Sequence, residues 1–273
     1  MAKTQEQKAA AFRALHEGEP FLIPNPWDAG AARVMAALGF RALATTSAGF
    51  AFTLGRPDGS VTLAETVDHV AAVDGATELP VSVDLENGFG DAPEDAATAI
   101  RRVAEAGAVG GSIEDFGPEI GIYPFDHAVE RVAAASEAAQ SLGFPFTLTA
   151  RAENHFRGNP DLEDTIARLQ AYERAGADVL YAPHLKSADE VRAVCEAVSA
   201  PVNVLAFPTL TMDAVVDAGA RRVSVGGLLT WVAVEAMADA AAQLRDAGDF
   251  SVLRGPQRVR VWLSGEPGPD ARG

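Results

Sequence analysis

The chain is poor in cysteine and lysine. Its 273 residues include one cysteine, Cys195, and three lysines, Lys3, Lys8 and Lys186. A single cysteine cannot form a disulfide within the chain, which is typical of a reducing compartment and predicts a cytoplasmic protein. Lysine forms Schiff bases with carbonyl substrates, but Lys186, the one candidate, lies in a predicted loop rather than in a strand. The composition therefore gives little support to Schiff-base chemistry.

Positive charge and long apolar runs are also scarce. The chain carries 22 Lys and Arg against 38 Asp and Glu, a net charge of −16. Nucleic acids and anionic membrane surfaces require basic patches, so neither is expected as a partner. No run of about 18 apolar residues suggests a membrane span, and the N-terminal residues lack the apolar core of a signal peptide. An acidic substrate would need local positive charge from an arginine or a metal ion.

One pattern repeats along the chain: a short apolar run, a polar or glycine-bearing turn, and an amphipathic helical stretch. Glycine follows several of these stretches, as expected for helix ends before a turn into the next strand. Eight strands alternating with helices predict a parallel sheet closed into a single (β/α)8 barrel over 1–273, with a C-terminal extension from about 250 to 273 that breaks the alternation. The strands are expected at 21–24, 42–47, 80–86, 110–114, 145–151, 178–183, 201–206 and 222–226.

Alternate residues of a barrel strand face the interior, and the others face the helices. In strand 80–86 the apolar residues share one side, so Asp84 and Glu86 are expected to point inward. The same reasoning places Glu114 inside on the next strand and Arg151 inside on the one after it. Further round the barrel, His184 and Asn203 fall on inward phases. These side chains are therefore predicted to converge at the carboxyl ends of the strands, where such barrels keep their active sites.

Three carboxylates held close together resist ionisation unless a cation joins them. A hard divalent ion with oxygen ligands meets this need, which predicts Mg²⁺, with Mn²⁺ as an alternative, held by Asp84, Glu86 and Glu114. Arg151 is then placed to bind a substrate carboxylate. An isolated acid at a strand end is more often an exposed side chain or a helix cap, and Asp91 and Asp115 are interpreted in that way. His184 is equally consistent with a capping or partly exposed histidine.

Six short sequence elements lie one after another on the predicted βα units. They are Pro24-Asn25-Pro26-Trp27-Asp28-Ala29, Thr46-Ser47-Ala48-Gly49-Phe50, Leu54-Gly55-Arg56-Pro57-Asp58, Val83-Asp84-Leu85-Glu86-Asn87-Gly88-Phe89-Gly90, Ile113-Glu114-Asp115 and Thr149-Ala150-Arg151. With these elements, the stretch 22–244 resembles the isocitrate lyase/phosphoenolpyruvate mutase superfamily.

The resemblance implies a Mg²⁺-dependent barrel that binds a 2-oxo acid or its enolate and makes or breaks an adjacent C–C or C–P bond. By position, Asp84, Glu86 and Glu114 would hold the metal, partly through water. Backbone N–H groups of the turn Thr46, Ser47 and Ala48 would bind the substrate carboxylate or oxo group, and Asp58 matches an active-site aspartate. The resemblance also implies a homodimer or homotetramer, in which the last helix, about 228–244, is exchanged between subunits.

The loop after the fourth strand departs from the family. The lyase branch carries Lys-Arg-Cys-Gly-His there, with a catalytic cysteine, whereas the stretch 116–124 is short and has no Cys, Lys or His. The lysine and polar residues of the mutase and phosphonopyruvate hydrolase branches are absent as well. Tyr123 is the one side chain of this loop that could donate a proton, so it is the predicted proton donor. Glu86 stands where an aspartate is common.

Three functions agree with these features. The leading hypothesis is a Mg²⁺-dependent carbon–carbon lyase or decarboxylase for a small 2-oxo or hydroxy di- or tricarboxylate, of the isocitrate lyase, 2-methylisocitrate lyase or oxaloacetate decarboxylase kind. The second is a C–P bond enzyme of the phosphonopyruvate hydrolase or phosphoenolpyruvate mutase type, for which Arg56 and Lys186 are the additional cations. The third is a barrel that binds 2-oxo acids without turnover. The sequence does not choose the substrate.

Overall fold

Eight parallel strands form one sheet in the order β1-β10-β9-β8-β7-β4-β3-β2. The structure is a computed structural model that describes residues 3–253, 255 and 258–264. The two edge strands meet, because the Ala44 amide donates to the Pro24 carbonyl at 3.1 Å. The sheet is thus a nearly closed barrel, which confirms the predicted (β/α)8 fold. Its strands, all within the expected ranges, are β1 (Phe21–Ile23), β2 (Leu43–Ala44), β3 (Val81–Asp84), β4 (Gly110–Glu114), β7 (Thr147–Arg151), β8 (Val179–Tyr181), β9 (Val202–Leu205) and β10 (Arg222–Ser224).

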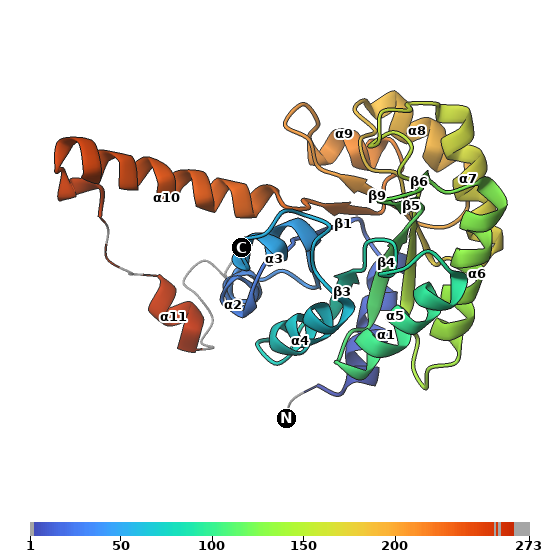
Figure 1. Cartoon of the computed structure of the whole chain (residues 1–273), viewed down its shortest axis with the longest axis horizontal. Helices are drawn as coiled ribbons and strands as arrows, with labels where there is room; N and C mark the ends of the chain where they lie inside the picture. Colours follow the sequence, from blue (N-terminus) through green and yellow to red (C-terminus); the bar gives the residue numbers. More distant parts are fainter. Residues whose placement is uncertain (1–2, 254, 256–257, 265–273) are drawn as a thin grey trace.

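Helices follow the strands, and most of them lie around the barrel (Figure 1). They are α1 (Gln5–Glu17), α2 (Ala29–Ala37), α3 (Ser47–Thr53), α4 (Leu63–Asp74), α5 (Pro93–Glu105), α6 (Phe125–Gln140), α7 (Leu162–Arg174), α8 (Ala188–Ala197), α9 (Met212–Asp217), α10 (Leu228–Ala247), the 3₁₀ turn η1 (Phe250–Val252) and α11 (Val259–Ser264). Local sequence fixes several of their ends. Ser187 and Glu190 form a capping box at the start of α8. Gly107 ends the α5 turn with φ +109°, a backbone conformation that favours glycine.

The strand phases expected from the sequence are confirmed. Val83 and Leu85 are buried against α5, in one apolar cluster with Ile113 of β4. Val81 is buried in a second cluster with residues of α2 and α4. The alternate residues Ser82, Asp84 and Glu86 line the interior at the carboxyl ends of the strands. Burial of the apolar side against the helices therefore forces the carboxylates into the barrel.

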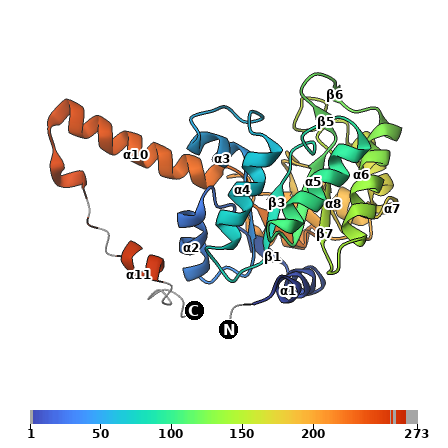
Figure 2. The same ribbon diagram turned by 60° about the horizontal axis from the view of Figure 1, so that its bottom comes forward.

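The loop after β4 folds into a small hairpin, which the sequence did not predict. Strands β5 (Phe116–Gly117) and β6 (Gly121–Ile122) pair antiparallel, and Gly121 adopts φ +83° in the turn. The hairpin rises beside the mouth of the barrel (Figure 2). It brings Phe116 to the rim of the central cavity.

Helix α10 projects away from the barrel (Figures 1 and 2). Of its 20 residues, Thr230 is the buried one, whereas Val232 is 66% and Met237 62% exposed. The chain then turns back, and the Arg33 guanidinium of α2 donates to the Leu263 carbonyl of α11 at 2.9 Å. The expected C-terminal extension thus packs in part on α2, and the remainder of it, at 254, 256–257 and 265–273, lies outside the described residues. Among the described helices, none is both long and apolar enough to cross a membrane.

Candidate active site

A cavity of about 880 Å³ opens at the carboxyl ends of the strands. Ten of the eleven residues predicted from the sequence line it: Thr46, Ser47, Ala48, Asp58, Asp84, Glu86, Glu114, Arg151, His184 and Asn203. The barrel therefore brings together residues that are up to about 160 positions apart in the chain, as its topology requires. Tyr123 is the predicted site residue that does not line the cavity.

Arg151 lies at the centre of the carboxylates. Its guanidinium is 2.8 Å from Asp84 Oδ1, 3.0 Å from Glu114 Oε2 and 2.8 Å from Glu153 Oε1. Burial alone would lower the pKa of Arg151, but the field of Glu153, Glu114 and Asp84 outweighs it and raises that pKa. The arginine is thus permanently charged, and its position is fixed from three sides.

The predicted metal-binding carboxylates differ in how far they are already paired. Asp84 accepts from Arg151 through Oδ1 and from the Ser47 amide and hydroxyl, at 3.2 and 3.0 Å, through Oδ2. Glu86 follows β3 in a left-handed backbone conformation with φ 49°, and its buried Oε1 has no hydrogen-bond partner among the described residues. Burial raises the pKa of the Glu86 carboxyl to about 8, and Asp84 and Asp58 act in the same direction. An ionised Glu86 therefore requires a further cation.

The residues fit a divalent cation that keeps part of its water shell. The donors are carboxylate oxygens, as hard cations prefer, and the orphaned Glu86 oxygen is an available one. Within the described part of the chain, however, no group of three or more acidic, histidine or cysteine side chains stands ready to enclose an ion. Arg151 occupies the space between Asp84 and Glu114. One or two direct carboxylates with bound water, the usual arrangement for Mg²⁺, agrees with this geometry.

The turn from Thr46 to Ala48 opens α3 at the cavity wall. Thr46 is the N-cap of this helix, and its hydroxyl accepts from the Gly49 amide at 3.3 Å. Because the first amides of a helix have no intrahelical acceptor, the turn presents N–H groups to the cavity. The Ser47 amide is held by Asp84 in this structure. Asp58 lies at the exposed rim of the cavity and accepts from the Gly59 amide.

Tyr123, the predicted proton donor, is fully buried outside the cavity. Its hydroxyl donates to Asp91 Oδ1 at 2.5 Å and accepts from Asn87 Nδ2 at 3.0 Å. Burial and the hydrogen bond to Asp91 raise the pKa of Tyr123 to about 12. Because its hydroxyl contacts Asn87 and Asp91, Tyr123 stabilises the loop before α5 and does not reach a substrate in the cavity.

Two charged residues in the loop after β7 were missed in the sequence. Glu153 is buried and pairs with Arg151. Arg157 lines the cavity, lies 3.3 Å from Glu114 Oε1 and 3.5 Å from Glu153 Oε2, and stacks 3.6 Å above the Phe116 ring. Glu153 lies two positions after Arg151 and continues the same inward phase. This spacing is the one signal in the sequence that could have indicated Glu153.

Asp115 was wrongly interpreted as an exposed or capping acid. It is 3% exposed and accepts from the Glu153 amide at 2.7 Å, from Arg168 at 3.0 Å and from the Tyr172 hydroxyl at 2.5 Å. Burial raises its pKa, although these donors oppose the shift. Asp115 thereby ties the loop that carries Glu153 to helix α7.

A second polar layer forms the floor of the cavity. Arg222 of β10 donates to Asn203 Oδ1 at 2.8 Å and to Thr149 Oγ1 at 3.0 Å. It also lies 3.3 Å from His16 Nε2, and His16 Nδ1 is 2.9 Å from the Phe12 carbonyl. Asn203, predicted to bind substrate, has both its oxygen and its amide nitrogen engaged, the latter with Ser224 Oγ at 3.0 Å. It lines the cavity as part of this floor.

Residues 12–245 match the family model of phosphoenolpyruvate phosphomutase. The chain belongs to the isocitrate lyase/phosphoenolpyruvate mutase superfamily. A solved Burkholderia cenocepacia protein, provisionally described as a lyase or mutase, is 51% identical, with a TM-score of 0.93 over 96% of this chain and 99% of that one. The 2-methylisocitrate lyase of Halalkalibacterium halodurans is 34% identical over 81% of this chain and 76% of its own length. The oxaloacetate decarboxylase of Rhodopseudomonas palustris is 31% identical over 76% and 73%.

Membership of this superfamily makes the chain an enzyme, and its relatives support a lyase. The expectation drawn from the sequence resemblance is thus confirmed at this level. The 2-methylisocitrate lyase and the oxaloacetate decarboxylase are named for small carboxylates.

Proposed function

We propose that this superfamily member is a divalent-metal-dependent carbon–carbon lyase or decarboxylase acting on a small 2-oxo or 2-hydroxy carboxylate. The observation that carries the proposal is the position of Arg151 among Asp84 and Glu114, beside the unpartnered Glu86 oxygen. Mg²⁺, or Mn²⁺ in its place, would be held by Asp84, Glu86 and Glu114, partly through water.

Arg151 is the proposed carboxylate anchor. Its hydrogen bonds to Asp84 and Glu153 use three of the five N–H donors of a guanidinium. Glu114 lies 3.0 Å from Nη2, and one Nη1 donor is left for a ligand. The Ala48 amide of the turn is a second donor for the carboxylate or oxo group, because the Ser47 amide donates to Asp84. These groups are fixed before the substrate arrives, so they stabilise developing negative charge without reorganising.

The bound cation would polarise the oxo group of the substrate and stabilise negative charge on its oxygen. In a decarboxylation, the bond between C3 and the distal carboxyl carbon breaks, carbon dioxide leaves, and C3 takes a proton. Because Tyr123 is buried outside the cavity, we do not propose it as the proton donor. Asp58 lies at the rim of the cavity, and its charge contributes to the raised pKa of Glu86.

A screen of four substrates tests the reaction class. Oxaloacetate, 2-methylisocitrate and phosphonopyruvate are followed by pyruvate formation, and isocitrate by glyoxylate. We expect turnover of a substrate in which a carbon–carbon bond breaks, and we expect EDTA to abolish it. Asp84→Ala should lower turnover by at least about a hundredfold, because the loss of a metal ligand, or of a group that orients one, has effects of this size. Full metal-dependent turnover by Asp84→Ala would contradict the proposal. Release of phosphate from phosphonopyruvate would instead select the C–P alternative.

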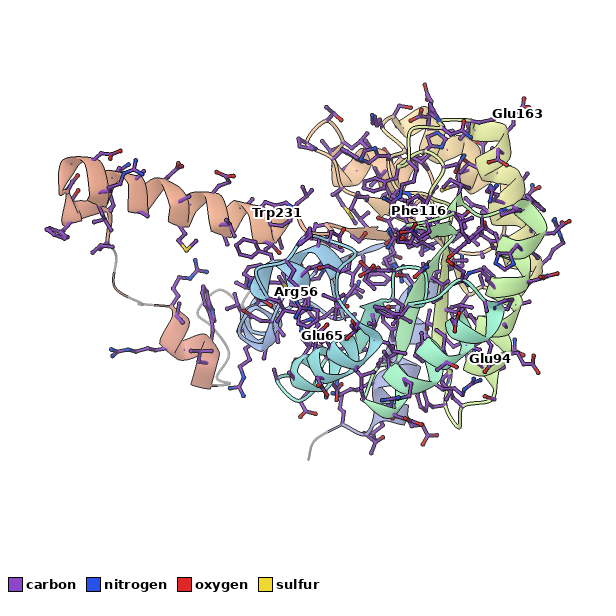
Figure 3. The ribbon with its side chains drawn as sticks, in the orientation of Figure 1. Arg56, Glu65, Glu94, Phe116, Glu163 and Trp231 are labelled. Atoms are coloured by element: carbon purple, nitrogen blue, oxygen red, sulfur yellow. The ribbon has the colours of Figure 1, made fainter. Side chains whose placement is uncertain are left out.

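The structure gives that alternative little support. Arg56, one of its two candidate cations, pairs with Glu65 at 2.9 Å on the surface, where Figure 3 labels both side chains. Neither Arg56 nor Lys186 is among the residues that line the cavity. A non-catalytic binder would show metal-dependent 2-oxo acid binding with no product in the same screen.

We also propose that α10 packs on a second copy of the chain in a homodimer or homotetramer. Its exposed apolar residues, with Val232 and Met237 the most exposed, and its projection from the barrel support an exchanged helix. Light scattering should give a mass at least twice that of the chain, and a Val232→Asp/Met237→Asp variant should shift it toward the monomer. A monomeric wild-type protein would contradict this assembly.

A further inference from the structure

The two sides of the cavity differ in chemistry. Its acids come from one side of the barrel, with Asp84 and Glu86 at the end of β3 and Glu114 at the end of β4. Apolar side chains come from the other side: from the loops after β7, β8 and β9, from the end of β9 and from the start of α10. These are Phe156, Pro183, Leu205, Phe207, Leu228 and Trp231.

Aromatic rings form the rim of the apolar side. The His184 ring packs edge-on against Phe156 at 4.8 Å and against Phe207 at 5.1 Å. Phe156 is still 44% and Trp231 39% exposed, although both line the cavity. Figure 3 labels Trp231 at the first turns of α10 and Phe116 on the hairpin, from strands four places apart in the barrel order. Apolar surface of this extent is free to be covered by a ligand.

The nearest cation on this side is already engaged. Arg157 donates to Glu114, lies 3.5 Å from Glu153 as an ion pair, and places its guanidinium face over the Phe116 ring. The other guanidiniums that line the cavity are Arg151, held by the acids, and Arg222, held in the floor. A second carboxylate on a substrate would therefore meet rings and prolines beyond the reach of an uncommitted positive charge, and would lose its hydration there.

The cavity is also larger than a small oxo acid needs. At roughly one liquid-water volume, about 30 Å³, for each heavy atom, a six-atom acid such as pyruvate fills at most about 180 Å³. The cavity has a volume of about 880 Å³. An acid head group at Arg151 thus leaves most of the cavity to the remainder of the substrate.

We propose that the side formed by Phe156, His184 and Phe207 is a subsite for an uncharged apolar substituent, preferably aromatic, on the 2-oxo or 2-hydroxy acid. The proposal rests on the function proposed above and specifies its substrate: a carboxylate head group bound at Arg151, the carboxyl or carbonyl carbon that leaves from C3, and a further alkyl or aryl substituent that occupies this side of the cavity. Burial of that group supplies its binding free energy.

Equilibrium binding separates these possibilities without turnover. Calorimetry with Mg²⁺ present gives the dissociation constants of pyruvate, 2-oxoglutarate and phenylpyruvate, which share a head group and differ in the distal part. We expect phenylpyruvate to bind at least about tenfold more tightly than pyruvate, because a buried phenyl ring contributes that much. We expect 2-oxoglutarate to bind no more tightly than pyruvate.

Single-ring deletions locate the subsite. Phe207→Ala and Phe156→Ala should each lower the ratio of phenylpyruvate to pyruvate affinity by about fivefold. Phe125→Ala is the matched control, because its ring is similarly exposed at 37% but lies outside the cavity lining, and it should keep the wild-type ratio. Unchanged ratios in both cavity variants would overturn the subsite.

The remaining outcomes are also decisive. If pyruvate binds and phenylpyruvate binds no more tightly, the subsite is wrong while the oxo-acid site stands. If 2-oxoglutarate binds most tightly, Arg157 anchors a second carboxylate and the apolar assignment is overturned. If none of the three binds, the proposed function fails and the subsite fails with it.

Discussion

Two arginines inside the barrel differ in the charge of the groups that surround them. Arg151, at the end of β7, contacts Asp84, Glu114 and Glu153. Arg222, at the start of β10, contacts the neutral groups of Asn203, Thr149 and His16. Burial lowers the pKa of Arg222 to about 10, whereas the surrounding acids raise that of Arg151.

The difference separates a binding layer from a structural floor. Around Arg151, the acids Asp84, Glu86, Glu114 and Glu153 outnumber the guanidiniums of Arg151 and Arg157, so the upper layer has negative charge to spare for a cation. Around Arg222, each donor that the hydrogen bonds above describe has a neutral acceptor, so the lower layer is complete without a ligand. Substitutions in the upper layer should therefore change the activity, and substitutions in the lower layer should change the free energy of unfolding.

The largest effect is expected at Arg151. Arg151→Ala should lower kcat/KM by about a thousandfold or more, because it removes the carboxylate anchor and leaves three buried acids without their partner. Arg151→Lys is the matched control; it keeps the charge but cannot span the same set of oxygens, and should recover only part of the loss. Steady-state kinetics on the substrate found in the screen measures both. Activity within tenfold of wild type in Arg151→Ala would remove Arg151 from the site.

Arg222→Met should act on stability instead. The change leaves Asn203 Oδ1 and other buried groups without a donor, so we expect the free energy of unfolding to fall by about 3 kcal/mol. Urea denaturation measures it, and kcat/KM of the folded variant should stay within about tenfold of wild type. A variant as stable as wild type but without activity would show that Arg222 belongs to the upper layer.

Acid should weaken the floor through His16. Its Nδ1 faces the Phe12 carbonyl, which only accepts, so Nε2 accepts from Arg222 and the ring is neutral. Burial, then Arg222, lowers the pKa of His16 from 6.5 to about 3, and burial lowers that of His69 to about 4. At these two histidines the unfolded chain thus binds more protons than the folded chain below pH 6.5, and their contribution lowers stability as pH falls from 6.5 toward 3. Glu86, with its raised pKa, acts in the opposite direction.

The cost attributable to His16 is about 2 kcal/mol at pH 5. Urea midpoints between pH 7 and pH 5 measure it. His16→Gln should lose about 2 kcal/mol less stability than wild type over this interval, because His69 and Glu86 titrate alike in both proteins. A decline as steep in His16→Gln as in wild type would show that His16 is not neutral in the folded protein.

The smallest effect is expected at Tyr123. Tyr123→Phe removes one hydroxyl that joins Asp91 and Asn87 outside the cavity, so we expect a loss of about 1 kcal/mol in stability and less than about threefold in kcat. Thermal unfolding and steady-state kinetics together measure this. A kcat reduced a hundredfold would reinstate the tyrosine as proton donor.

The strands and their phases could be predicted because a half-polar strand has a period of two. That period alone placed Asp84, Glu114 and Arg151 on the inner face, where the structure has them. The alternation of strands with helices then brought the strand ends to one face of the barrel. Glu86 continues the same pattern two residues beyond Asp84, although its own backbone is in the left-handed conformation.

Residues held by loops could not be predicted in the same way. Arg157 lies six positions beyond β7, where no periodicity relates it to Glu114, and the direction of Tyr123 depends on the unpredicted β5–β6 hairpin. Asp115 was misjudged because burial beside Arg168 and Tyr172 is a property of helix α7 packing, which one strand does not reveal. The floor contact of Arg222 with His16 joins residues 206 positions apart.

A calorimetric titration with Mg²⁺ tests the division between the two layers most directly. Wild type should bind one equivalent of ion, Glu86→Gln should bind it at least about tenfold more weakly, and Arg222→Met should bind it as wild type does. Absence of binding to the wild-type protein, or equal affinity in Glu86→Gln, would contradict a metal site in the upper layer.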